Sequence, residues 1–142
     1  MNKKIIGFTC SSFDLLHAGH IIMLKDAKKQ CEHLIVGLQT DPTLDRPDTK
    51  NKPIQTFEER LIQLEAVKYI DEIIKYSTED ELYKLIKSMN PDIRILGSDY
   101  RKKSFTGDDL DIKIYYHNRD HSYSSTNLRK KIFLEEGKKN NQ

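Results

Sequence analysis

Short apolar runs alternate with amphipathic stretches along most of the chain, and this alternation limits its fold more than any other feature. The apolar runs are typical of strands, and they cover residues 5–9, 34–38, 70–76, 93–96 and 112–117. The amphipathic stretches predict helices over 20–30 and 124–136, with two more behind the capping-box pairs Thr56/Glu59 and Thr78/Glu81. Strands that alternate with helices form βαβ units with right-handed crossovers. We therefore expect an α/β protein with a parallel sheet and helices on both faces.

Size and composition narrow the class of protein further. The 142 residues fit one domain, which we place at 1–137, with Gly137 ending the last helix and a disordered tail at 138–142. The mean hydropathy is −0.70, and no apolar stretch approaches the roughly 20 residues that a membrane helix needs. The net charge of +2 argues against a dedicated nucleic-acid binder. The two cysteines, Cys10 and Cys31, fit a reducing cytoplasm better than a disulfide framework.

The loop at 10–20 is the most informative segment, because ligands of parallel sheets bind at the carboxyl ends of the strands. It reads Cys-Ser-Ser-Phe-Asp-Leu-Leu-His-Ala-Gly-His and joins a predicted strand to a predicted helix. His17 and His20 can project into one site, Gly19 leaves room for a ligand, and the helix N-terminus attracts anions. The plainer alternative is a pair of capping or solvated histidines. A zinc site made of these histidines and the two cysteines lacks the C-x₂-C spacing.

The run from Ser12 to His20 resembles the HxGH motif of the nucleotidyltransferase superfamily, and most closely that of the glycerol-3-phosphate cytidylyltransferase family. Later segments resemble the same family. They are Asp41 after the second strand, the lysines Lys50 and Lys52 ahead of Glu58-Glu59-Arg60, the turn Gly97-Ser98-Asp99-Tyr100, and Arg119 ahead of Ser124-Ser125-Thr126. The resemblance covers roughly residues 4–134 and implies a Rossmann-like fold.

The resemblance also implies a role for each matching residue. The catalytic residues would be His17, His20, Lys52 and Arg119. The nucleotide would be bound by Ser11, Ser12, Phe13, Gly19, Lys50, Asp99, Ser124, Ser125 and Thr126. The acceptor would be bound by Asp14, Asp41 and Arg60, and Asp14 would also help to hold Mg²⁺.

Several of these residues have plainer interpretations. The two lysines could be solvated loop charges, Asp99 could be a turn former, and Arg60 could pair with Glu59 or Glu65. Ser124, Ser125 and Thr126 would cap the last helix in any case. Two departures from the family pattern leave the acceptor open: Ser11-Ser12 replaces Gly-Thr or Gly-Cys, and Ser122-Tyr123 replaces Gly-Ile.

The function that the resemblance implies is transfer of CMP from CTP to a small phosphorylated alcohol, such as glycerol 3-phosphate, with release of pyrophosphate. Two alternatives stay open. One is an adenylyltransferase that acts on a sugar phosphate, because heptose-phosphate adenylyltransferases share the first motif and a Gly-x-Asp-Tyr turn like that at 97–100. The other is a non-catalytic nucleotide-binding regulator. The resemblance further implies a homodimer that uses Mg²⁺. From the composition described above, we expect this homodimer to be cytoplasmic and to bind neither nucleic acid nor membranes.

Overall fold

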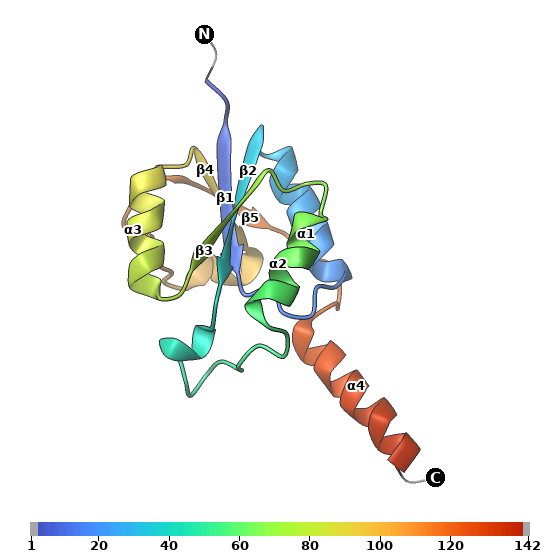
Figure 1. Cartoon of the computed structure of the whole chain (residues 1–142). Helices are drawn as coiled ribbons and strands as arrows, with labels where there is room; N and C mark the ends of the chain where they lie inside the picture. The colour runs from blue at the N-terminus through green and yellow to red at the C-terminus, as the bar shows by residue number, and fades with distance from the viewer. Residues whose placement is uncertain (1–2, 141–142) are drawn as a thin grey trace.

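The fold is a parallel sheet between helices, as the computed structural model of residues 3–140 shows (Figure 1). The strands β1 (Ile6–Ser11), β2 (His33–Gln39), β3 (Glu72–Tyr76), β4 (Ile93–Gly97) and β5 (Lys113–His117) are parallel and lie in the order β3-β2-β1-β4-β5. The α-helices within these residues are α1 (Ala18–Lys29), α2 (Phe57–Glu65), α3 (Glu79–Met89) and α4 (Ser125–Asn140), and the 3₁₀ helices are η1 (Pro42–Leu44) and η2 (Ser98–Lys102). The predicted α/β, Rossmann-like class is confirmed.

Each face of the sheet has its own apolar core. Helices α1 and α2 cover one face, where Leu24, Ala27 and Leu64 pack on strand residues such as Val36. Helix α3 covers the other face. The strand residues of β2 alternate between the two cores because side chains of a strand point to opposite sides in turn. The carboxyl ends of the strands lead into loops and the 3₁₀ helices at one edge of the sheet, at the bottom of Figure 1.

The predicted strands are confirmed with small shifts of their ends. The largest shifts are of two residues. Strand β1 continues to Ser11, and β3 begins only at Glu72 because Ile70 still donates its N–H to the carbonyl oxygen of Val67 in a turn. Helix α1 starts at Ala18, two residues earlier than expected, because the side chain of His17 caps it. The 3₁₀ helices η1 and η2 were not expected.

Helix α4 contradicts one expectation. It continues through Gly137 to Asn140, so Gly137 does not end it and residues 138–140 of the predicted disordered tail are helical. A glycine inside an exposed helix costs only about 1 kcal/mol, which does not force a stop. Residues 141 and 142 lie outside the described part of the chain.

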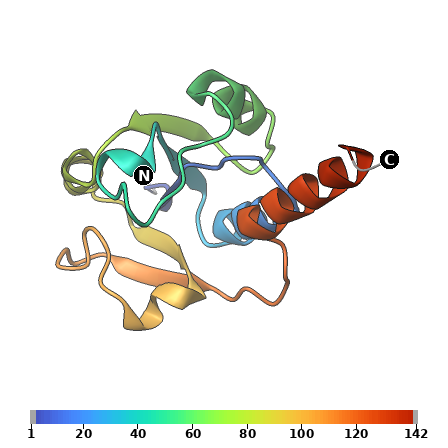
Figure 2. The same cartoon turned by 90° about the horizontal axis from the view of Figure 1, so that it is seen from below.

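Helix α4 contacts the body of the molecule only near its start and then leaves it, as both ribbon views show (Figures 1 and 2). None of its residues is buried, and Ile132, Phe133 and Leu134 are exposed. Within residues 3–140, no helix is both long enough and apolar enough to span a membrane.

Candidate active site

A cleft of about 850 Å³ opens at the carboxyl ends of the strands. Figure 2 views the molecule from this end of the sheet. It lies where the winding of the sheet reverses, because β1 pairs with β2 on one side and with β4 on the other. The cleft is lined by many of the residues that the sequence singles out: Ser11, Ser12, His17, Gly19, His20, Lys50, Asp99, Arg119, Ser124, Ser125 and Thr126. The remaining candidates, Phe13, Asp14, Asp41, Lys52 and Arg60, do not line it.

The first turn of α1 fixes the two motif histidines. Nδ1 of His17 accepts the N–H of Gly19 at 3.0 Å, and Nδ1 of His20 accepts the N–H of His17 at 3.2 Å. The two rings stack with centroids 3.8 Å apart. A main-chain N–H can only donate, so each Nδ1 is an acceptor and each neutral ring carries its proton on Nε2. The site therefore presents two Nε2–H donors at a helix N-terminus, a combination suited to phosphate oxygens.

The histidines are neutral donors rather than cations near neutral pH. Burial, and then the neighbouring His17, lower the pKa of His20 to about 4, against the weaker opposing effect of Asp14. The pKa of His17 is also lowered, by burial first and then by Arg119 and His121. These two rings therefore bind an anion by hydrogen bonding and not by ionic attraction.

Acid should weaken the fold through His20. Between pH 6.5 and about 4 the unfolded chain takes up a proton that folded His20 refuses, so stability falls as the pH is lowered through this window. The expected slope from this one group is at most about 1.4 kcal/mol per pH unit between the two pKa values, and it fades out over about one pH unit above 6.5. Urea unfolding at pH 7, 6 and 5 measures it. His20→Gln, which does not titrate, should flatten the slope, and an unchanged slope would contradict the shifted pKa.

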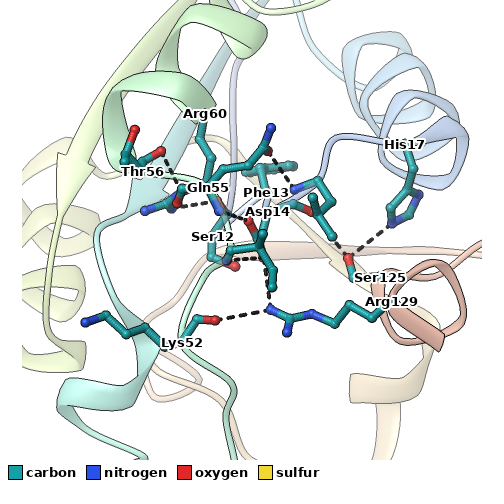
Figure 3. A network of polar contacts seen from close by, with 12 residues as sticks. Ser12, Phe13, Asp14, His17, Lys52, Gln55, Thr56, Arg60, Ser125 and Arg129 are labelled. Carbon is teal, nitrogen blue, oxygen red and sulfur yellow. Dashed lines mark hydrogen bonds and ion pairs between the residues drawn. The ribbon is translucent and has the colours of Figure 1, made fainter. Parts of the chain in front are cut away.

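The start of α4 closes over the same site. Oγ of Ser125 lies 3.3 Å from Nε2 of His17 and 3.4 Å from the carbonyl oxygen of Asp14 (Figure 3). With the proton of His17 on Nε2, this ring donates to Ser125, and Ser125 donates to Asp14. Ser124 caps α4 by accepting the N–H of Asn127 at 3.0 Å. Capping and a place in the cleft are therefore compatible for this serine pair.

Asp14 has a structural role that differs from the predicted one. Its carboxylate accepts the N–H groups of Ile54 and Gln55, both at 2.9 Å, and pairs with Arg129 at 3.0 Å (Figure 3). The side chain is buried, and these contacts use both carboxylate oxygens. Asp14 therefore does not fit the expected role of metal ligand or acceptor ligand. It ties the loop before α2, and helix α4, to the histidine loop.

No group of three or more His, Cys, Asp or Glu side chains able to hold a metal ion occurs among residues 3–140. The zinc alternative is also excluded by position. Cys31 packs against Gly7 at the start of β1, whereas the histidines follow its end.

The side chains of Phe13 and Arg60 also have other roles than the predicted ones. Phe13 is 1% exposed and belongs to the apolar core, where its ring supports His20 with centroids 5.4 Å apart. Its side chain therefore supports the site from behind instead of contacting a nucleotide.

Arg60 is 1% exposed as well, and main-chain carbonyl groups surround its guanidinium. Nη1 donates to Ser12 and Gln39 at 2.8 and 2.6 Å, Nη2 to Thr40 at 2.7 Å, and Nε to Gln55 and Thr56 at 3.2 and 3.3 Å. The expected bidentate clamp on an acceptor phosphate is therefore wrong, because the group is already used. The pairing with Glu59 or Glu65 is absent from these contacts too.

The lysine loop and Asp41 lie at the border of the site. Lys50 lines the cleft, but Lys52 is exposed outside it, and Figure 3 shows its side chain pointing away from Arg129, which binds its carbonyl oxygen at 3.2 Å. Asp41 caps η1 by accepting the N–H and hydroxyl of Thr43 at 2.9 and 2.6 Å, and these bonds lower its pKa. The roles of Lys52 and Asp41 toward substrates stay predictions.

Two side chains that line the cleft, Arg94 and His117, were not among the candidates from the sequence. Arg94 is buried on β4, donates to the carbonyl oxygen of Thr106 and lies over the ring of Phe105. His117, at the end of β5, binds Asp26 of α1 through Nδ1 at 2.7 Å. A polar residue inside an apolar strand run was the available signal for both. The sequence contains no such signal for Asp26, because it lies among the charged residues of an amphipathic helix.

Comparison with known proteins shows which family the chain belongs to. A family model described as cytidylyltransferase-like matches residues 8–131, which include the histidine loop and the start of α4. The chain belongs to the cytidylyltransferase-like family. This confirms the resemblance at the level of the HxGH nucleotidyltransferases, and the nucleotidyltransferase class with it.

Individual relatives of this cytidylyltransferase-like chain are bifunctional proteins. It is 34% identical to bifunctional protein HldE of Campylobacter jejuni over 92% of its own length, and 36% identical to HldE of Caulobacter vibrioides over 74%. It spans only 28% and 22% of those two proteins. A solved lipopolysaccharide core biosynthesis protein of Thermoplasma volcanium is similar at a TM-score of 0.69 and 28% identity, covering 84% of this chain and all of that one.

A more distant structure shows the fold alone. The pantoate–β-alanine ligase of Francisella tularensis has a TM-score of 0.64 at 21% identity, over 91% of this chain and 66% of that one.

Proposed function

We propose that this chain transfers a nucleotidyl group from ATP to a sugar phosphate and releases pyrophosphate. The observation that carries the proposal is the pair of Nε2–H donors of His17 and His20 at the N-terminus of α1, inside a cleft that also holds Arg119. A phosphate oxygen of the acceptor attacks the α-phosphorus and forms a new P–O bond. The bond from the α-phosphorus to the oxygen that bridges it to the β-phosphate breaks, and pyrophosphate leaves with that electron pair. Positioning and charge stabilisation then supply the catalysis.

The chain's own groups divide this work. Nε2–H of His20 donates to the triphosphate oxygens, where negative charge grows in the transition state. Nε2–H of His17 contacts Oγ of Ser125 in this structure, and it exchanges that partner for a triphosphate oxygen when the nucleotide binds. Arg119 and Lys50, both on the cleft wall, supply positive charge for the same phosphates. Mg²⁺ would enter with the triphosphate, since the carboxylate of Asp14 is already used.

ATP and a sugar phosphate are better supported than CTP and glycerol 3-phosphate. The similarity to the bifunctional HldE proteins favours this alternative. The similarity to a lipopolysaccharide core biosynthesis protein points to sugar chemistry as well. The turn at 97–100, Gly-Ser-Asp-Tyr, agrees with both. CTP stays the second candidate because Arg119 before the serine pair resembles the cytidylyl family.

Thermal unfolding with each nucleotide tests the choice. A ligand that binds only the folded state raises the Tm, and at equal concentration the tighter ligand raises it more, so ATP with Mg²⁺ should raise it more than CTP does. A larger shift with CTP would return the assignment to the cytidylyl branch.

Turnover separates an enzyme from a nucleotide-binding regulator. We expect pyrophosphate release when the protein, Mg²⁺ and ATP are mixed with a heptose 1-phosphate, and little release with glycerol 3-phosphate. All four triphosphates crossed with both acceptors form the test matrix. Nucleotide binding without release in any combination would favour the regulator.

A further inference from the structure

A third imidazole, that of His121, lies over the first turn of α1. A Cβ atom built on Gly19 would stand 2.9 Å from Cε1 of His17 and 3.0 Å from Cε1 of His121, so both rings meet over the same glycine. Both also line the cleft. The sequence motifs give His121 no role, because it lies between Arg119 and the serines that carry the resemblance.

The hydrogen bonds of His121 leave one donor without an acceptor. Nδ1 accepts the N–H of Tyr123 at 3.2 Å, so the proton of the neutral ring is on Nε2, as in His17 and His20. Nε2 of His121 is buried and has no hydrogen-bond partner within residues 3–140. Leaving a buried donor unpaired is costly, so such a group usually has a ligand or another partner to satisfy.

We propose that Nε2–H of His121 donates a hydrogen bond to a phosphate oxygen of the bound nucleoside triphosphate. The inference rests on the proposed function and extends it. The anion site then has three neutral imidazole donors, two from the motif loop and one from the loop that leads into α4. Because the third donor comes from a different segment, binding of the triphosphate would also fasten the loop at 119–125 to the start of α1.

His121→Asn tests the proposal without removing the local turn. An asparagine side chain can accept the N–H two residues ahead, as the histidine does for Tyr123, but it cannot place a donor where Nε2 lies. We expect Kd for ATP, and for pyrophosphate alone, to rise about tenfold or more in this variant, as calorimetry would measure. His33→Asn is the matched control, because His33 begins β2 and contacts Glu72 outside the cleft.

The outcomes separate this inference from the proposed function. Weaker binding of both ligands to His121→Asn, with the control unchanged, supports the third donor. Equal affinity of His121→Asn and the natural protein overturns it and leaves the proposed function standing. If the natural protein binds neither a triphosphate nor pyrophosphate, the proposed function itself is wrong and this inference with it.

Discussion

His20→Ala is expected to lower kcat about a hundredfold or more. The substitution removes an Nε2–H donor from the place where negative charge develops, and loss of one such donor typically has an effect of this size. The change also removes the acceptor for the N–H of His17, which should lower the free energy of unfolding by only about 1 kcal/mol. Pyrophosphate release measures the first effect, and urea unfolding the second.

His33→Ala is the control for this experiment, because it removes an imidazole far from the cleft. Its kcat should match that of the natural protein. If His20→Ala turned over close to the natural rate, His20 would have no catalytic role.

The largest loss of stability is expected from Arg60→Met. The methionine keeps much of the side-chain volume but leaves three carbonyl oxygens without their donors, that of Gln39 buried and those of Ser12 and Thr40 partly buried. An unsatisfied buried acceptor costs about 1–3 kcal/mol, so the free energy of unfolding should fall by about 3 kcal/mol or more. Urea unfolding gives this number directly.

Arg60→Lys should recover only part of the loss, since an ammonium group cannot reach carbonyl oxygens on both sides as a planar guanidinium does. Arg101→Met is the control, because Arg101 is exposed and its guanidinium lies over Tyr116. A loss below about 1 kcal/mol in Arg60→Met would show that the carbonyl groups find other partners, such as water.

The helices and strands could be predicted because their starts depend on residues that are close in the sequence, such as capping pairs. Thr56 and Glu59 form the expected capping box, with Thr56 N–H on the carboxylate and Glu59 N–H on the hydroxyl. At α3 the pattern holds only in part. Thr78 caps Glu81 as expected, but the carboxylate of Glu81 accepts the N–H of Ser77 instead.

The site could be predicted in its location but not in its internal contacts. The carboxyl ends of parallel strands meet at one edge, so a motif loop after β1 and one after β5 had to converge. The partners of Asp14, in contrast, are Ile54 and Gln55 some 40 residues away and Arg129, 115 residues away. No sequence spacing encodes such pairs. The same holds for Arg60, whose partners are main-chain atoms and carry no residue signature.

The backbone of the motif loop takes its shape from distant parts of the fold. Phe13 and Leu15 hold φ values of 48° and 52°, a left-handed conformation that side chains disfavour. Contacts with residues far away in the sequence stabilise this conformation. They are the core around Phe13 and the hydrogen bond from Leu15 N–H to the side chain of Gln55 at 2.9 Å. An excised peptide of residues 10–20 lacks these partners and would relax to ordinary φ values. The phosphate-binding geometry is therefore a property of the assembled protein, acquired in the same cooperative step as its core.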